Sequence, residues 1–339
     1  MQQADVMSSA PTFERQDTPR VRPVIALLVA LGISAVFVLA PWESVSRQGF
    51  PDRGNYLATI NILVADGRHN FEYREQDVLS IVVNEYVWRE VLTFIGNFVT
   101  EPENGISAIS FLAFFIVESL IVLRAGVIYG FMFMSAPLTV DLFWSQTRSG
   151  LALALFMLAI ALRRPWGRYA LFVVAGLTHT FAAVLWLVYE WNKGIEVVCR
   201  AGLRTKVLAL ILGCAISVLW VYYAADIFSV IGDRRAHDAG ADTTSVRFGL
   251  WWMLCLSALV LFAHHRPRSV NGQYVLLAIA LLSTFVFTIL FGGYAMRFLA
   301  LSVPFVCIAI RSVRERATRF GIAGGVVGFN VIHSLYWVS

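Results

Sequence analysis

Charged residues are scarce in this chain, and that scarcity excludes a soluble domain. Of its 339 residues, 14% are Asp, Glu, Lys or Arg and 58% are hydrophobic, and the mean hydropathy is +0.69. Soluble domains carry about 25% charged residues. Many apolar segments approach the ~20 residues that cross a bilayer, so the sequence predicts an all-α, polytopic membrane bundle of about 10 spans. The candidate segments are 23–41, 105–123, 126–145, 149–162, 169–191, 206–226, 248–263, 273–292, 298–310 and 320–338.

Paired cysteines and recognisable cofactor motifs are also missing. The cysteines lie in or beside apolar segments without paired spacing, which indicates neither a disulfide framework nor a zinc site. The sequence has no nucleotide-binding glycine loop and no nucleophile elbow. It therefore predicts chemistry that uses no metal and no cofactor. The cysteines in question are Cys199, Cys214, Cys255 and Cys307.

Positive charge is present, but it is clustered. The net charge of +5 comes mostly from short runs between apolar segments, as the positive-inside rule predicts for cytoplasmic loops, so it indicates topology rather than nucleic-acid binding. Residues 1–22 are predicted to be a cytoplasmic polar tail before an uncleaved signal anchor, and residues 23–339 the membrane domain. The clusters predicted to be cytoplasmic are the tail, Arg163–Arg168, His264–Arg268 and Arg311–Arg319.

Threading the chain between these clusters places two loops on the outer face, 42–104 and 227–247. The apolar-looking stretch Leu79–Val99 then lies along the membrane face instead of crossing it. Polar residues interrupt this stretch too often for a lipid-exposed span, so it is predicted to be an amphipathic helix. The interrupting residues are Asn84, Glu85, Arg89, Glu90 and Asn97.

Segment 169–191 has basic residues on both flanks, and one crossing cannot place both of them inside. The middle of the segment, residues 175–181, reads AGLTHTF. We predict two half-helices folded into a hairpin, because a broken backbone is tolerated at membrane depth only where protein or a watery cavity satisfies its polar groups. His179 would then lie in a cavity that opens outward.

Arg148 begins the apolar segment 149–162, and the predicted threading places it outside. One interpretation makes it a structural ion pair with Asp141, two helical turns earlier. The other makes it a phosphate-binding guanidinium, because this group stays charged and offers a forked set of donors. Arg297 also begins a span, where snorkelling at the interface is the alternative.

Other outward residues also admit two interpretations. His179 is either a satisfied core histidine or a reactive group. The stretch Asp52–Tyr56 is either an ordinary turn or part of a site, and Glu85 either belongs to a solvated helix face or is a site carboxylate. These residues are all predicted to lie on the outer side of the membrane, which favours a reactive site that faces away from the cytoplasm. This outward set is Asp52, Arg53, Glu85, Arg89, Arg148, His179, Arg234, Arg235, His237, Arg247 and Arg297.

The order of these residues resembles the EpsG-like branch of Wzy-type polysaccharide polymerases. The resemblance covers roughly residues 50–300, in short and degenerate motifs. At Ser149 the family usually has Gln. The matching elements are Asp52-Arg-Gly-Asn55-Tyr56, Glu85-Tyr-Val-Trp88, Arg148-Ser149-Gly150-Leu151-Ala152, His179-Thr-Phe-Ala-Ala183 and a late Arg297.

The resemblance implies a GT-C-like glycosyltransferase of the bacterial inner membrane. Such an enzyme joins undecaprenyl-pyrophosphate-linked repeat units of O-antigen or exopolysaccharide at the periplasmic face. Outward arginines would stabilise the leaving pyrophosphate without a metal, and the acceptor hydroxyl needs a base. The resemblance implies Glu85, His179 and Asp52 as candidate catalytic groups, and Arg148, Arg297, Tyr56, Arg89, Arg247 and Tyr294 as candidate substrate-binding residues.

The expected partners are the lipid-linked oligosaccharide, the lipid bilayer, a flippase and a chain-length regulator, and no nucleic acid. Two alternatives stay open. An O-antigen ligase or another lipid-linked glycosyltransferase would use similar arginines. A lipid-linked oligosaccharide flippase would carry charges through the membrane depth and on both sides, which the outward bias disfavours. A multispan acyltransferase is a weaker alternative, because His179 lacks a local acidic neighbour in the sequence.

Overall fold

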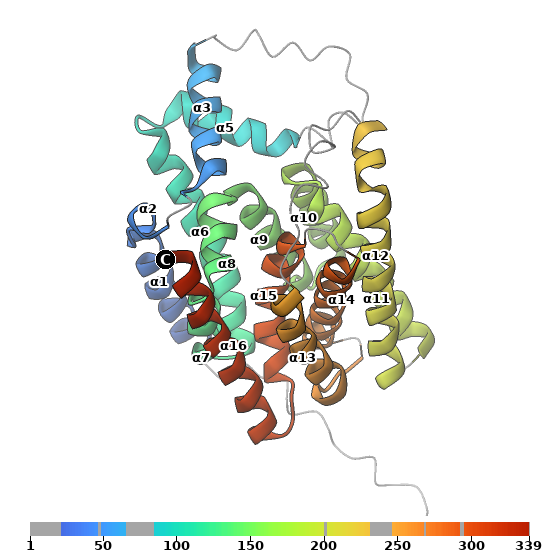
Figure 1. Ribbon diagram of the computed structural model, residues 1–339. Coiled ribbons are helices and arrows are strands. Elements are labelled where there is room, and N and C mark those ends of the chain that lie inside the picture. Colours follow the sequence, from blue (N-terminus) through green and yellow to red (C-terminus); the bar gives the residue numbers. More distant parts are fainter. Residues whose placement is uncertain are drawn as a thin grey trace, which may run out of the picture.

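The described part of the chain is entirely helical apart from one isolated bridge between Ala263 and Val313 (Figure 1). The computed structural model describes residues 22–46, 49–65, 85–199, 202–230, 246–267, 269–291 and 295–338. The all-α prediction is confirmed for these residues. The predicted tail up to residue 21, residues 47–48 and 66–84 of the predicted 42–104 loop, and residues 231–245 of the predicted 227–247 loop, with Arg234, Arg235 and His237, lie outside them.

Fifteen α-helices and one π-helical segment make up the described ranges. In chain order they are α1 (Pro23–Leu39), α2 (Trp42–Val45), α3 (Pro51–Ala65), α5 (Tyr86–Phe98), α6 (Pro102–Arg124), α7 (Val127–Met134), α8 (Pro137–Val140), η1 (Asp141–Ser145), α9 (Thr147–Ala161), α10 (Pro165–Thr178), α11 (Phe181–Cys199), α12 (Leu203–Val230), α13 (Val246–Phe262), α14 (Val270–Leu290), α15 (Met296–Arg311) and α16 (Arg316–Val338).

Several helices are long and apolar enough to cross a bilayer, as in a multi-pass membrane protein. By length and composition, α6, residues 203–223 of α12, and α14 qualify. The segment from α7 to η1 adds a fourth candidate if its two bent parts count as one span. The shorter apolar helices are α1, α9 and residues 248–262 of α13.

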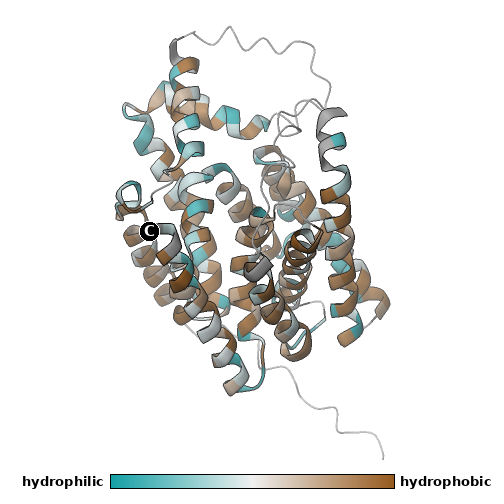
Figure 2. Cartoon of the chain, in the orientation of Figure 1, coloured by the Kyte–Doolittle hydropathy of each residue, from teal (hydrophilic) through white to brown (hydrophobic). Residues whose placement is uncertain are grey.

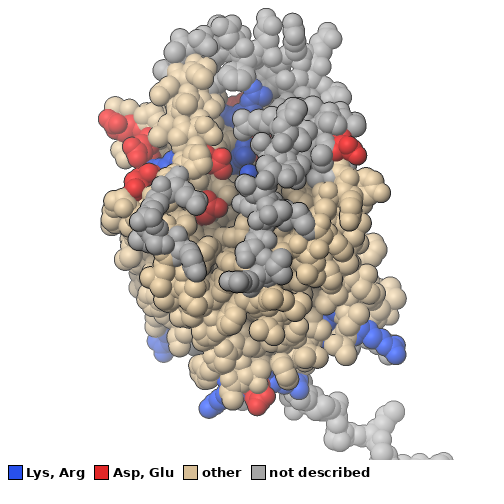
Figure 3. Space-filling view, viewed as in Figure 1, with Lys and Arg blue, Asp and Glu red and all other residues tan. Residues whose placement is uncertain are grey.

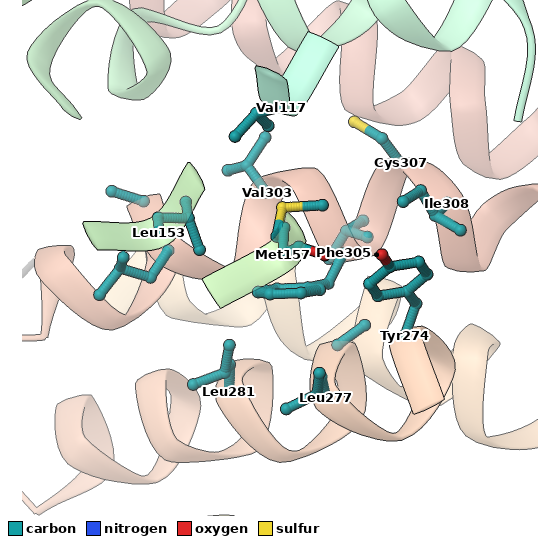
Figure 4. Packing of buried hydrophobic residues seen from close by; sticks show 14 of the residues in the cluster. Val117, Leu153, Met157, Tyr274, Leu277, Leu281, Val303, Phe305, Cys307 and Ile308 are labelled. Atoms are coloured by element: carbon teal, nitrogen blue, oxygen red, sulfur yellow. Dashed lines mark hydrogen bonds between the residues drawn. The ribbon is translucent and has the colours of Figure 1, made fainter. Parts of the chain in front are cut away.

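The core forms around α14, which is the most deeply buried of the candidate spans. Its Tyr274, Leu277 and Leu281 face Met157 of α9 and Phe305 of α15 (Figure 4). The Tyr274 hydroxyl donates to the carbonyl oxygen of Met157 at 3.4 Å, so this buried polar group is satisfied. The core therefore joins α9, α14 and α15, which lie far apart in the sequence.

Small residues allow α12 and α14 to pack closely. A Cβ built on Gly213 would lie 2.3 Å from the carbonyl oxygen of Ala280 and 1.8 Å from Ser283 Oγ. One turn later, Ser217 Oγ donates to the carbonyl oxygen of Thr284 at 2.8 Å. This combination of small residues with an interhelical hydrogen bond is typical of helix pairs in membranes.

The predicted span over 126–145 is broken in the middle. Helix α7 ends at Met134, α8 begins at Pro137, and the two parts meet at 77°. Proline disfavours helix at the residue before it and supplies no N–H, so the helix breaks there. Thr139 Oγ1 donates to the Phe133 carbonyl oxygen at 2.8 Å and satisfies that carbonyl group beside the break.

The predicted helix break in 169–191 is confirmed. Helix α10 ends at Thr178 and α11 begins at Phe181. The ring of Phe172 lies 5.5 Å from Trp186 and 5.4 Å from Tyr189, centroid to centroid. These pairs are placed nearly symmetrically about the break at His179, so the two helices run antiparallel.

One end of the molecule holds α3 and α5 above the bundle (Figure 1). Within the predicted amphipathic stretch 79–99, residues 79–84 lie outside the described ranges and residues 86–98 form α5. Helix α5 is amphipathic, because Trp88, Leu92 and Ile95 are buried whereas Glu90 and Asn97 are exposed. Hydrophilic residues are frequent in α3 and α5 and sparse along the bundle helices (Figure 2). Acidic side chains gather at this end, whereas the opposite end carries mainly Lys and Arg (Figure 3).

We expect the end with α3 and α5 to face away from the cytoplasm, because the basic end should be cytoplasmic. Glu101 and Glu315 are both exposed. In a cysteine-free background, an impermeant thiol reagent added to intact cells should label Glu101→Cys and leave Glu315→Cys unlabelled. Labelling of Glu101→Cys only after the cells are opened would contradict this orientation.

A buried polar cluster fastens α11 to α14. Glu196 Oε1 contacts His265 Nε2 at 2.5 Å, and Gln273 Nε2 donates to Glu196 Oε2 at 2.7 Å. All three side chains are buried.

We expect Glu196→Leu to lower the free energy of unfolding by about 3–5 kcal/mol, because it leaves buried polar partners without their acceptor. Glu190→Leu, on the same helix, is the matched control. Its ion pair with Lys193 is partly exposed, so the loss should stay below about 1 kcal/mol. Thermal unfolding in one detergent compares them, and equal midpoints would refute a stabilising role for the cluster.

Candidate functional site

Glu85 stands at the start of α5 in a backbone conformation that non-glycine residues rarely adopt. Its φ and ψ are 56° and 54°, and it is the one non-glycine residue with positive φ among the described ranges. Such a conformation costs on the order of 1–3 kcal/mol and persists only where the surroundings hold it. The side chain is 9% exposed. Glu85 is thus an ionisable residue that is both buried and held in a strained backbone conformation.

Two cationic or protonatable side chains hold the Glu85 carboxylate. Arg148 Nη1 forms an ion pair with Glu85 Oε2, and His179 Nδ1 lies 2.5 Å from Glu85 Oε1. Each residue comes from a different place: the start of α5, the first turn of α9, and the break between α10 and α11. The structure therefore brings together three residues that the sequence nominated separately. We call Glu85, Arg148 and His179 the triad.

Two aromatic side chains line the same region. Tyr56 of α3 packs edge-to-face on Trp88 of α5, with ring centroids 4.9 Å apart. Burial raises the pKa of Tyr56, and the positive charge of Arg148 opposes that shift. The sequence motif contained Trp88, but nothing in the sequence nominated it as a site residue.

Three buried polar atoms in this region lack a hydrogen-bond partner within the described residues. They are Tyr56 Oη, Trp88 Nε1 and Arg148 Nε. Buried polar groups are normally satisfied, so an unsatisfied group requires an explanation. Two of these atoms are N–H donors and the third is a hydroxyl, so together they suit a ligand rich in oxygen acceptors.

Arg53 anchors the site from below. Its guanidinium lies 4.1 Å from the centre of the Trp144 ring, and its Nη2 donates to Ser107 Oγ at 2.8 Å. Burial lowers the pKa of Arg53, whereas Glu103 and Glu43 raise it. These contacts fix α3 against α6 and η1, and so they fix the position of Tyr56.

Asp141 does not pair with Arg148, so that structural interpretation was wrong. The partner of Asp141 is Gln146, whose Nε2 donates to Asp141 Oδ2 at 2.8 Å. The reason is the π-helical turn at Asp141–Ser145, which breaks the continuous helix that the pairing required. The alternative of a turn at Asp52–Tyr56 was also wrong, because this stretch lies in the first turns of α3.

The remaining predicted site residues lie around the triad or outside the description. Asp52 is half-buried on α3 and interacts electrostatically with Tyr56. Arg89 is half-buried one turn after Glu85. Arg297 is exposed at the start of α15 and interacts electrostatically with Asp141 instead of contacting the triad. The side chain of Arg247, and Tyr294 as a whole, lie outside the described residues.

The described residues contain no group of three or more His, Cys, Asp or Glu side chains placed to hold a metal ion. No family model matches the chain, and searches of curated proteins and of solved structures gave no match. The chemistry of the site must therefore be argued from its own geometry.

The triad is suited to moving a proton next to a bound anion. A carboxylate at Nδ1 fixes the tautomer and orientation of an imidazole and stabilises the imidazolium, as in other His–carboxylate pairs. His179 would then exchange a proton through Nε2. Arg148 supplies a permanently charged fork beside it. A protonatable imidazole and a permanent cation thus contact the two oxygens of one carboxylate.

Proposed function

We propose that this chain is a polysaccharide polymerase of the bacterial inner membrane, a glycosyltransferase that joins undecaprenyl-pyrophosphate-linked repeat units of O-antigen or exopolysaccharide. The observation that supports it is the triad, in which Arg148 and His179 meet on the Glu85 carboxylate. The reaction needs both a base for the acceptor hydroxyl and a cation for the departing pyrophosphate. The resemblance to EpsG-like polymerases supplies the substrate class.

In the proposed mechanism, His179 takes the proton from the acceptor hydroxyl as its oxygen attacks the anomeric carbon of the donor. The bond from that carbon to the pyrophosphate oxygen breaks, and the lipid pyrophosphate leaves with the electron pair. Glu85 positions His179 and stabilises its charged form. Arg148 stabilises the developing negative charge through its free Nε–H and its second amino group. The chain itself is expected to need no metal or cofactor.

The proposal includes a bundle of about 10 spans with a GT-C-like arrangement and the triad on the periplasmic side. Its partners would be the lipid-linked oligosaccharide and the bilayer, together with a flippase and a chain-length regulator. The concentration of acidic side chains at the end with α3 and α5 supports this sidedness (Figure 3).

Gene deletion followed by gel analysis of surface polysaccharide tests the proposal. A polymerase deletion should leave single repeat units in place of a ladder, and the full-length gene should restore the ladder. Long chains that accumulate on the carrier lipid would indicate an O-antigen ligase instead. Single units trapped on the cytoplasmic face would indicate a flippase. An unchanged ladder would remove polysaccharide assembly from consideration.

A further inference from the structure

An apolar groove lies between α5 and α6. Its volume is about 550 Å³, within the range of about 300–1,000 Å³ that small-molecule sites occupy. The two helices touch beneath it, because a Cβ built on Gly105 would lie 2.7 Å from Ile95 Cγ2. The groove is therefore closed at its base and open at its side. Its walls include Tyr86, Val91 and Phe94 from α5, and Gly105, Ala108 and Ile109 from α6.

One end of the groove lies beside a member of the triad in the chain. Tyr86 and Val87 line it and directly follow Glu85 in the chain. From there it follows α5, whose 13 residues correspond to about 20 Å of helix. Phe94 along this path is 59% exposed, so the groove presents an uncovered aromatic surface.

The sign of the charge changes along the groove. The Arg148 guanidinium pairs with Glu85, the residue that precedes Tyr86 at one end of the groove. Farther along, the lining residue Glu90 is exposed and acidic, so a second anionic group would be repelled there. A ligand that fits this pattern has one anionic head at the triad and an apolar chain along the groove.

We propose that the α5–α6 groove holds the polyprenyl chain of the lipid-linked substrate while the phosphate of that substrate lies at Arg148. The inference rests on the proposed function for the identity of the lipid, whereas the shape and polarity of the site come from the groove itself. Its open side allows the chain to enter laterally from the membrane. The groove then delivers the reactive phosphate end to the triad.

Photocrosslinking in the purified full-length protein tests this placement. A photoreactive amino acid is introduced at Val91 in the groove or at Leu28, which is 61% exposed on α1 and serves as the lipid-facing control. With a radiolabelled long-chain polyprenyl phosphate, labelling at Val91 should exceed labelling at Leu28 by roughly tenfold. Unlabelled polyprenyl phosphate should compete, and phosphatidylglycerol should not. Equal labelling at the two positions, or equal competition by phosphatidylglycerol, would mean that ordinary bilayer lipid fills the groove.

A second variant tests the groove without relying on the crosslinking position. Ala108 and Ala58 are both exposed, and only Ala108 lines the groove. Combined with the Val91 probe, Ala108→Trp should reduce labelling roughly tenfold, and Ala58→Trp should not change it. Retained labelling in Ala108→Trp would overturn the proposal. Specific labelling at Val91 could also be found while deletion of the gene leaves the polysaccharide ladder unchanged. That combination would disprove the polymerase function and would still support a lipid-binding groove.

Discussion

Glu85→Gln is expected to reduce polymer formation by about 10²–10⁴-fold, the usual contribution of positioned general acid–base catalysis. The substitution keeps the size of the side chain and removes its charge. His179 then loses the anion that stabilises its protonated form, and Arg148 loses its ion-pair partner. Single repeat units should accumulate, as measured by gel analysis at equal levels of membrane-inserted protein.

Glu101→Gln is the matched control, because Glu101 is an exposed carboxylate that belongs neither to the triad nor to the residues that line the α5–α6 groove. It should leave the polymer ladder unchanged. His179→Gln should reproduce the loss seen in Glu85→Gln, and the double variant should be no worse than either single one, because residues that act as a unit are not additive. A Glu85→Gln protein that builds a normal ladder would disprove the catalytic arrangement.

Polymer formation should be lower in Arg148→Lys than in the wild type, and lower still in Arg148→Ala. Lysine keeps the charge and loses the forked geometry, whereas alanine loses both. A charge-assisted hydrogen bond to phosphate contributes about 1.5–3 kcal/mol, which corresponds to roughly 10- to 150-fold in rate if it is made in the transition state. In vitro elongation of a purified lipid-linked repeat unit gives the rates.

The double variant Arg148→Gln/Glu85→Gln distinguishes a phosphate-binding role of Arg148 from a purely structural ion pair with Glu85. If the pair only neutralised buried charges, the double variant should recover much of the lost activity, since no unpaired charge remains. We expect no recovery. Asp141→Asn is the control, because Asp141 bonds to Gln146 and not to Arg148, so its effect should be small. Normal elongation by the double variant would exclude a phosphate-binding role for Arg148.

Much of the fold could be predicted from the sequence because it depends on local patterns. The hairpin at His179 followed from basic residues on both flanks, and the amphipathic α5 from its interrupting polar residues. The helix break before Pro137 also has a local cause, the proline itself. It was not predicted, because the apolar residues on both sides of Pro137 indicated a single span. The local rule of two helical turns also favoured the wrong partner for Arg148, because the π-helical turn between Asp141 and Arg148 shifts the register.

The contacts within the site could not be predicted, because they join distant parts of the chain. Arg148 and Glu85 are 63 positions apart, and His179 and Glu85 are 94 apart. Hydropathy and charge clusters place such residues on a common side and give no distances between them. The unsatisfied Trp88 and Tyr56 atoms likewise become visible only when burial is known.

In the proposed topology, the α10–α11 hairpin also sets the orientation of the helices that follow it. In a membrane, a segment that enters and returns on the same side leaves the orientation of later helices unchanged, whereas a full crossing would reverse them all. Straightening the chain at His179 would therefore exchange the two faces for α12 to α16, and Arg204, Arg266 and Arg314 would have to move to the side opposite Arg164. The His179 break that completes the triad is thus also the point on which the sidedness of the C-terminal half depends.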